Sequence, residues 1–157
     1  MPQFHRGGCL CGEIRYHTIG QPERTTICHC TFCQRLTGSA FLVEPVFRTA
    51  NVAFEQGAVA SYEHRSPAHG RRLTVHFCAR CGTHLSLSFE RFPGYLGVCG
   101  GTFDDPHWYR PDRHIFTQTA VRWMVFPPDV ACYRQHAIRL DGSPEEPWQE
   151  PPWPEAE

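Results

Sequence analysis

The sequence predicts a mostly β fold of small antiparallel sheets with little helix. Turn residues recur at short intervals, and the segments between them are β-branched or alternate between apolar and polar residues. The chain of 157 residues also contains 14 prolines and 13 glycines, which argues against long helices. A chain of this length is most simply one domain with one hydrophobic core.

Six segments are expected to form strands, and one short segment a helix. In residues 73–77 and 85–89 the apolar side chains fall on every second position, so one face of each strand should pack and the other meet water. A helix of one or two turns is expected over residues 31–36, ended by Gly38. The predicted strands span residues 13–19, 40–47, 72–77, 84–89, 95–102 and 131–140.

The C-terminal residues differ in composition from the rest of the chain. From Asp141 onward, prolines are interleaved with acidic residues and two tryptophans. We therefore expect residues 1–140 to form one domain and residues 141–157 a Pro-rich tail. Trp148 and Trp153 could dock on the domain or on a neighbouring subunit, but a loosely held terminal segment is the commoner outcome.

The charge balance and the first residues restrict the partners and the location of the protein. A formal net charge of −1 and a pI of about 6.8 favour neither nucleic acid nor an anionic membrane as a partner. Lysine is absent, which excludes Schiff-base catalysis and a phosphate-loop lysine. The start carries no apolar signal segment, and no later stretch has the length of a membrane span, so we expect a cytoplasmic protein. In that reducing compartment, clustered cysteines more often hold metal than form disulfides.

Seven of the nine cysteines fall into three tight clusters. The Cys78-Ala79-Arg80-Cys81-Gly82 segment has the form of a zinc knuckle, in which two sulfurs point at one ion and the glycine adopts a left-handed conformation. The segment with Cys9, Cys11 and Gly12 resembles it with one residue fewer. Together the two pairs supply four thiolates, a set typical of structural zinc that ties distant parts of a chain together. The first site is thus predicted to use Cys9, Cys11, Cys78 and Cys81.

The middle cluster supplies three cysteines within six residues, namely Cys28, Cys30 and Cys33. Three protein ligands leave the fourth position of a zinc ion open, which is the mark of a catalytic site. Three thiolates make zinc a weak acidifier of water but a good host for another soft sulfur ligand. The cluster therefore indicates activation of a small thiol rather than hydrolysis.

Four other interpretations stay open at this point. The cysteines could form disulfides, or the middle zinc could be structural and closed by a fourth ligand from His29, His84, Cys99 or Cys132. Cys99, inside an apolar segment, is most simply a small buried hydrophobe. A nucleobase deaminase would match Cys11-Gly12-Glu13 but also needs a proline before a Cys-x-x-Cys pair, where this chain has Ile27 or Phe77. The fourth interpretation, after disulfides, a closed structural zinc and a deaminase, is a zinc-stabilised binding module without turnover.

The spaced motifs resemble the glutathione-dependent formaldehyde-activating enzyme family, which also includes centromere protein V. The resemblance covers roughly residues 5 to 125, with later landmarks at residues 101–106 and 113–116. The motifs that carry it are Gly7-Gly8-Cys9-Leu10-Cys11-Gly12, Cys28-His29-Cys30-Thr31-Phe32-Cys33-Gln34-Arg35, Thr37-Gly38-Ser39-Ala40-Phe41 and Phe77-Cys78-Ala79-Arg80-Cys81-Gly82-Thr83.

This resemblance implies an Mss4-like fold of curled β-sheets and two zinc ions per chain, one structural and one catalytic. Carried over by position, Cys9, Cys11, Cys78 and Cys81 hold the structural ion, and Cys28, Cys30 and Cys33 hold the catalytic one. The implied activity is that of a carbon–sulfur lyase which forms S-(hydroxymethyl)glutathione from formaldehyde and glutathione. Arg35 could meet a carboxylate of the thiol substrate, although a surface arginine is the simpler interpretation. The thiol, the electrophile, the general acid and the oligomeric state are not specified by the sequence.

Overall fold

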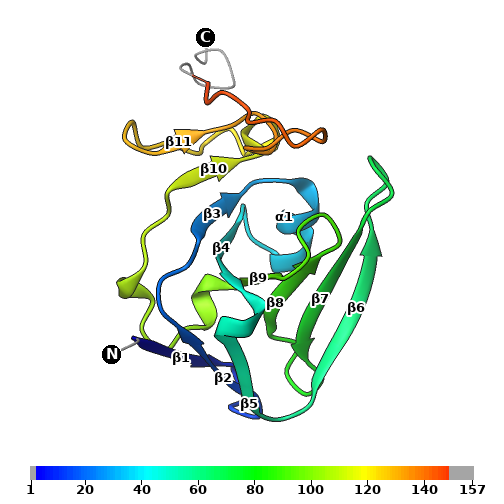
Figure 1. Ribbon diagram of the computed structural model, residues 1–157, viewed down its shortest axis with the longest axis vertical. Helices are drawn as coiled ribbons and strands as arrows, with labels where there is room; N and C mark the ends of the chain where they lie inside the picture. Colours follow the sequence, from blue (N-terminus) through cyan, green and yellow to red (C-terminus); the bar gives the residue numbers. More distant parts are fainter. Residues whose placement is uncertain (1–2, 149–157) are drawn as a thin grey trace. The chain divides into compact units, whose positions relative to one another are not determined.

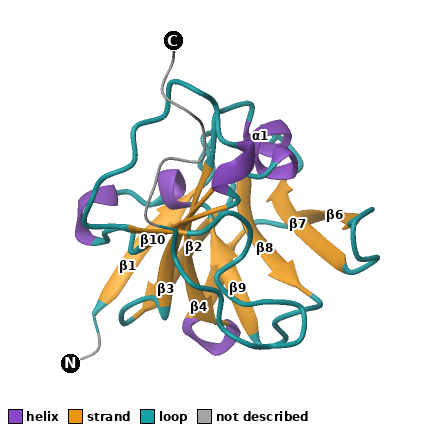
Figure 2. Ribbon diagram, turned by 90° about the horizontal axis from the view of Figure 1, so that it is seen from above, coloured by secondary structure: helices purple, strands orange, loops and turns teal. Residues whose placement is uncertain are grey.

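The structure is a computed structural model, and it describes residues 3–148. The chain divides into two compact units, each built from two separate stretches of sequence. Unit 1 comprises Met1–Arg24 and Glu44–Arg110, and unit 2 comprises Thr25–Val43 and Pro111–Glu157. Strands, turns and loops make up most of the described chain, as Figure 2 shows, which confirms the predicted mostly β class.

Unit 1 contains two sets of antiparallel strands. In the first, β2 (Arg15–Ile19) lies between β1 (Phe4–Gly8) and β5 (Val52–Gln56). In the second, each strand pairs with the next in an antiparallel ladder (Figure 1). This ladder runs in the order β4 (Leu42–Arg48, which enters the unit at Glu44), β9 (Tyr95–Val98), β8 (His84–Phe89), β7 (Arg72–Cys78) and β6 (Val59–Arg65).

The core of unit 1 brings apolar side chains together with cysteines of two clusters. Ile14, Phe47 and Leu85 are fully buried, and Cys9 and Cys78 belong to the same packed group. Burial of such side chains stabilises the fold by about 1.5–3 kcal/mol each. Two of the candidate metal residues of this unit, Cys9 and Cys78, are therefore anchored directly in its core.

Unit 2 is built on parallel pairing. Its strand β3 (Arg24–Cys28) pairs in parallel with β10 (Arg113–Ile115), which pairs in parallel with β11 (Ala131–Cys132) (Figure 1). Helix α1 (Thr31–Thr37) follows β3 after two residues and ends at Gly38, whose φ of 64° is left-handed. The helix expected over residues 31–36 is confirmed. The parallel pairs of unit 2 were not expected, because the sequence predicted antiparallel sheets.

The strand predicted over residues 84–89 is found with the same limits, the other predicted strands are found with changed limits, and five strands were not predicted. The segment 95–102 is a strand only to Val98, and of 131–140 only Ala131–Cys132 is a strand. Strand β8 is buried on both faces, because Ser86 is 0 % exposed, so the expectation that one face meets water was wrong there. The four 3-10 turns among the described residues are Thr49–Asn51, Gly100–Thr102, Pro106–Trp108 and Thr117–Thr119, and the strands without a prediction are β1, β3, β5, β6 and β10.

Part of the predicted tail makes defined contacts within unit 2. The backbone amide of Trp148 donates to the carbonyl of Cys132 at 2.9 Å, and its indole Nε1 donates to Thr117 Oγ1 at 2.8 Å. Trp153 lies outside the described residues. The domain boundary at residue 140 stays a prediction. Within residues 3–148, no helix combines the length and the apolar character needed to cross a membrane.

Candidate metal centres

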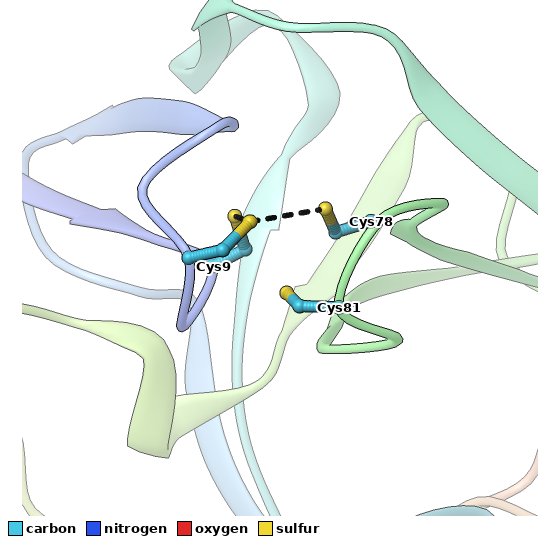
Figure 3. A group of neighbouring side chains, drawn as sticks. Cys9, Cys78 and Cys81 are labelled. Atoms are coloured by element: carbon cyan, nitrogen blue, oxygen red, sulfur yellow. Dashed lines mark hydrogen bonds between the residues drawn. The ribbon is translucent and has the colours of Figure 1, made fainter.

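Four cysteine sulfurs of unit 1 converge on one point. The Sγ atoms of Cys9, Cys11, Cys78 and Cys81 all lie within 4.8 Å of one another. The sulfurs of Cys9 and Cys11 are 3.5 Å apart, and those of Cys11 and Cys78 are 3.8 Å apart. In a tetrahedral site with zinc–sulfur bonds of about 2.3 Å, sulfurs are roughly 3.8 Å apart. The set thus fits a zinc ion in both donor type and spacing, and Figure 3 shows the side chains of Cys9, Cys78 and Cys81 directed toward each other.

Two turns with matching hydrogen bonds present these sulfurs. In the first turn, the Cys9 amide donates to the carbonyl of Ile14, and the Gly12 amide donates to the carbonyl of Cys9, both at 3.0 Å. In the second turn, the Cys78 amide donates to the backbone carbonyl of Thr83 at 3.0 Å, and the Gly82 amide donates to the backbone carbonyl of Cys78 at 2.8 Å. Gly12 and Gly82 have φ values of 75° and 74°. The predicted left-handed knuckle glycines are therefore confirmed.

Thr83 joins the two turns. Its Oγ1 accepts a hydrogen bond from the Leu10 amide at 3.1 Å and lies 3.1 Å from the Sγ of Cys81. One hydroxyl can accept from the amide and donate to the sulfur at the same time. Thr83 therefore ties the Cys9–Cys11 turn to the sulfur of the other turn.

Three cysteine sulfurs of unit 2 form the second group. The Sγ atoms of Cys28, Cys30 and Cys33 lie within 4.8 Å of one another. Cys28 ends β3, Cys30 is the N-cap of α1, and Cys33 lies in the first turn of that helix. The Cys33 amide donates to the sulfur of Cys30 at 3.3 Å, because an N-cap side chain accepts from the free amides of the first turn. The start of the helix thus folds the three sulfurs toward one point.

No fourth ligand joins this group within residues 3–148. No histidine, aspartate, glutamate or further cysteine of that range places a ligand atom within 4.8 Å of all three sulfurs. His29 is 0 % exposed, and its Nε2 bonds Nδ1 of His114 at 2.9 Å. The Sγ of Cys132 faces the carbonyl of Val130 at 3.5 Å. The four side chains considered as closing ligands, His29, His84, Cys99 and Cys132, thus remain outside the group.

Comparison with known proteins identifies the family. The family described as glutathione-dependent formaldehyde-activating enzyme matches residues 4–119. The chain belongs to this family. A curated Halomonas elongata protein, whose name assigns it provisionally to the glutathione-dependent formaldehyde-activating enzymes, is 23 % identical over 124 residues. That match covers 75 % of this chain and 78 % of the relative.

A solved structure has the same fold. The crystal structure of a Rhodobacter sphaeroides protein matches with a TM-score of 0.51 and 19 % sequence identity, covering 68 % of this chain and 91 % of that chain. At this identity the likeness concerns the fold alone. Family membership and the two sulfur groups together support metal binding by a chain of the glutathione-dependent formaldehyde-activating type.

The thiols of each group compete for protons, which a bound cation would relieve. Hydrogen bonds from Cys28 and Cys33 lower the pKa of Cys30 to about 3, while contact with Cys30 raises the pKa of Cys28. In unit 1, hydrogen bonds from Thr83 lower the pKa of Cys81 to about 5. The pKa of Cys9 is also lowered, while that of Cys11 is raised to about 12, so in each group some thiols ionise more readily and a neighbour less readily. A divalent ion would allow every sulfur of a group to be ionised, so both groups suit a thiolate-binding metal.

Arg35 lies exposed on α1, two residues after Cys33. No hydrogen bond or ion pair of its guanidinium occurs within the described part of the chain. The cation is thus available to solvent on the helix that carries Cys33. Its role toward a substrate stays a proposal.

Sequence reasoning missed the residues that hold the cysteines in place. The sequence motifs predict no role for Thr83, His114 or Thr119. The position of Gln34 directly after the third cysteine was the signal that could have singled it out. Its side-chain amide donates hydrogen bonds to the carbonyls of His29, in the cysteine loop, and Thr119.

Proposed function

We propose that this protein is a zinc-dependent carbon–sulfur lyase of the glutathione-dependent formaldehyde-activating type. The observation that carries the proposal is the group of Cys28, Cys30 and Cys33, to which no fourth histidine, cysteine or carboxylate within residues 3–148 is added. Membership of the family supports glutathione as the thiol and formaldehyde as the electrophile.

The cysteines would hold two zinc ions with different roles. Cys9, Cys11, Cys78 and Cys81 have the four-sulfur donor set of a structural ion, and Cys9 and Cys78 belong to the same buried core cluster as Ile14, Tyr16 and Leu85. Cys28, Cys30 and Cys33 would hold the catalytic ion. When bound there, zinc would supply a positive charge and an open coordination position that favour a small thiol as its thiolate.

The reaction joins a thiol to an aldehyde carbon. The sulfur lone pair forms the new carbon–sulfur bond, the carbonyl π electrons move to oxygen, and the thiol proton ends on that oxygen to give a hydroxymethyl thioether. Cys30 is only partly buried whereas Cys28 and Cys33 are buried, so the substrate would approach from the side of Cys30. Holding the two reactants side by side is the main contribution expected of the chain.

Arg35 is proposed as a contact for a carboxylate of the thiol substrate. It is exposed on α1, and its planar guanidinium matches a carboxylate in a two-bonded geometry. His29 is not proposed as the general acid. Burial, together with His114, lowers the pKa of His29 to about 4, so its ring stays neutral at physiological pH. A cytoplasmic location and the absence of nucleic acid and membrane partners are proposed with this function, from the cysteine usage and the near-neutral charge.

The test is Cys30→Ser, measured for zinc content, thermal unfolding and glutathione binding. We expect the variant to fold and keep one zinc per chain while glutathione binding is lost. The matched control is Cys132→Ser in the same unit, because a serine hydroxyl can keep the bond from residue 132 to the Val130 carbonyl. It should keep both zinc ions and the thiol site.

Three results would contradict the proposal. A Cys30→Ser protein that unfolds outright would make the second ion structural. A wild-type protein with closed coordination and no affinity for thiols would favour the alternative, a zinc-stabilised binding module without turnover. Absence of the hydroxymethyl product from wild-type protein with both ions, glutathione and formaldehyde would reject the lyase activity.

A further inference from the structure

The loop that carries the three sulfurs is held through the backbone of its second residue, His29. The His29 carbonyl accepts hydrogen bonds from Gln34 Nε2 at 2.7 Å and from Thr119 Oγ1 at 3.0 Å. The His29 amide donates to the carbonyl of Ile115 at 3.0 Å. Both lone pairs of the carbonyl and the amide hydrogen are therefore engaged. Since His29 stands between Cys28 and Cys30, fixing its backbone fixes the segments that bear two of the sulfurs.

Gln34 closes this arrangement into a junction. Its single amide nitrogen donates to the carbonyls of His29 at 2.7 Å and Thr119 at 2.8 Å, which uses both of its hydrogens. The Thr119 hydroxyl has one hydrogen, which it shares between the carbonyls of His29 at 3.0 Å and Phe116 at 2.9 Å. The first turns of α1, the cysteine loop and the 3-10 turn Thr117–Thr119 are thus connected by two side chains from positions 85 residues apart.

The ring of His29 is held as firmly as its backbone. It is fully buried, bonds His114 at 2.9 Å, and contacts the rings of Phe41 and Phe126 at centroid distances of 5.6 and 5.4 Å. The His29 ring is fixed on one side, and the His29 carbonyl accepts two hydrogen bonds on the other. The loop therefore has little freedom to rotate. A side-chain amide that bonds two carbonyls is difficult to replace, because both acceptors would lose a partner.

We propose that Gln34 and Thr119 are positioning residues for the second metal centre: they hold the Cys28–Cys33 loop so that its three sulfurs face one ion and leave a side open for the thiol. This inference rests on the proposed function of the three-cysteine group. It predicts that loss of either side chain weakens that centre while the four-cysteine centre in unit 1 is unchanged. Partners of this kind behind a metal site typically contribute about 10- to 100-fold in metal affinity.

The test is Gln34→Met, which keeps the length of the side chain and removes both donors. Zinc affinity of the two centres is measured by competition with a chromophoric chelator, and Co(II) absorption and glutathione titration follow the second centre. We expect about 10- to 100-fold weaker zinc binding at the second centre, altered sulfur-to-cobalt bands and weaker glutathione binding. The matched control is Gln21→Met, which should behave as wild type, because the exposed amide of Gln21 donates to Gln3 Oε1 at 3.3 Å and lies in unit 1.

Thr119 provides the second variant pair. Thr119→Val removes the hydroxyl and keeps the shape, and Thr119→Ser restores the hydroxyl and should restore zinc affinity. Because Gln34 and Thr119 bond one carbonyl, the effects of Gln34→Met and Thr119→Val should be clearly non-additive in a double-mutant cycle.

The outcomes separate this inference from the proposed function. If wild-type protein takes up one zinc and binds no thiol, the proposed function fails, and the positioning role fails with it. If wild-type protein binds two zinc ions and glutathione but Gln34→Met and Thr119→Val leave the second centre unchanged, only the positioning role is overturned. A Gln34→Met protein that loses both centres together also overturns it, because the residue would then serve folding in general.

Discussion

The two cysteine groups are assembled in opposite ways. In unit 1 the ligands themselves come from distant turns, since Cys11 and Cys78 are 67 residues apart, and two of the four, Cys9 and Cys78, lie within the packed core. In unit 2 the three ligands come from six consecutive residues, and it is their supports, His114 and Thr119, that come from far along the chain. A metal in the first group would hold the fold together, whereas a metal in the second would be held by a fold already formed.

The largest expected effect is the loss of the unit 1 centre. Cys78→Ser should remove one zinc and reduce the free energy of unfolding by about 5 kcal/mol, in the range of lost metal sites. Cys33→Ser should cost less, because the second centre does not join distant ligands. Chemical denaturation of both variants with zinc present measures the difference, and equal losses would break the comparison.

The sulfur groups could be predicted from the sequence because their information is local. The Cys-x-x-Cys-Gly spacing of residues 78–82 fixes a turn whatever surrounds it, and Gly38 marks the end of α1 in the same way. Strands β5 and β6 gave no such signal, because most of their side chains are exposed and alternation of apolar residues is weak. They are defined by backbone pairing with β2 and β7.

Long-range partners could not be predicted at all. The bond between His29 and His114 joins residues 85 positions apart, and no spacing rule connects them. Strand β10 has three residues, Arg113–Ile115, and becomes a strand only through parallel pairing with β3. The set of three cysteines could therefore be predicted from the sequence. The side chains that support it could be identified only from the tertiary structure.

A smaller effect is expected from the hydroxyl that joins the two knuckle turns. Thr83→Val should reduce the free energy of unfolding by about 2 kcal/mol, because the Leu10 amide and the Cys81 sulfur both lose a partner. Zinc should also leave the unit 1 centre more readily, and the second centre should be unchanged. Thermal unfolding and chelator competition measure both effects. Thr83→Ser is the control, and a serine variant as weak as the valine variant would argue against the hydrogen bonds.

A still smaller effect should follow from the knuckle glycine. Gly82→Ala meets no atom within 4 Å of the added methyl group, so its cost comes from the φ of 74°, about 1 kcal/mol. The control is Gly101→Ala, an exposed position that is equally open and lacks a positive φ. Equal unfolding midpoints for the two variants would show that the turn tolerates a side chain and does not restrict the unit 1 centre.

The smallest expected effect is the contribution of His5 to the loss of stability at acid pH, which is independent of the cysteine thiolates. Burial lowers the pKa of His5 in unit 1, against an opposing influence of Asp105. The unfolded chain therefore binds a proton that the folded chain does not as pH falls below about 6.5, so stability decreases with acidification. His5→Phe keeps an aromatic ring against Trp108 and should reduce this loss by less than about 1 kcal/mol between pH 7 and pH 6. Identical pH profiles of unfolding would exclude a contribution from His5.

The discontinuous make-up of both units affects the order of events at the ribosome. Translation at 5–20 residues per second separates the emergence of His29 from that of Thr119 by roughly 5–20 s. During that interval the thiols of Cys28, Cys30 and Cys33 are present on a nascent chain without the side chains that later support them. Cys9 and Cys11 similarly precede Cys78 and Cys81. Correct metal loading is therefore expected to follow chain completion, and the early thiols depend until then on a reducing environment.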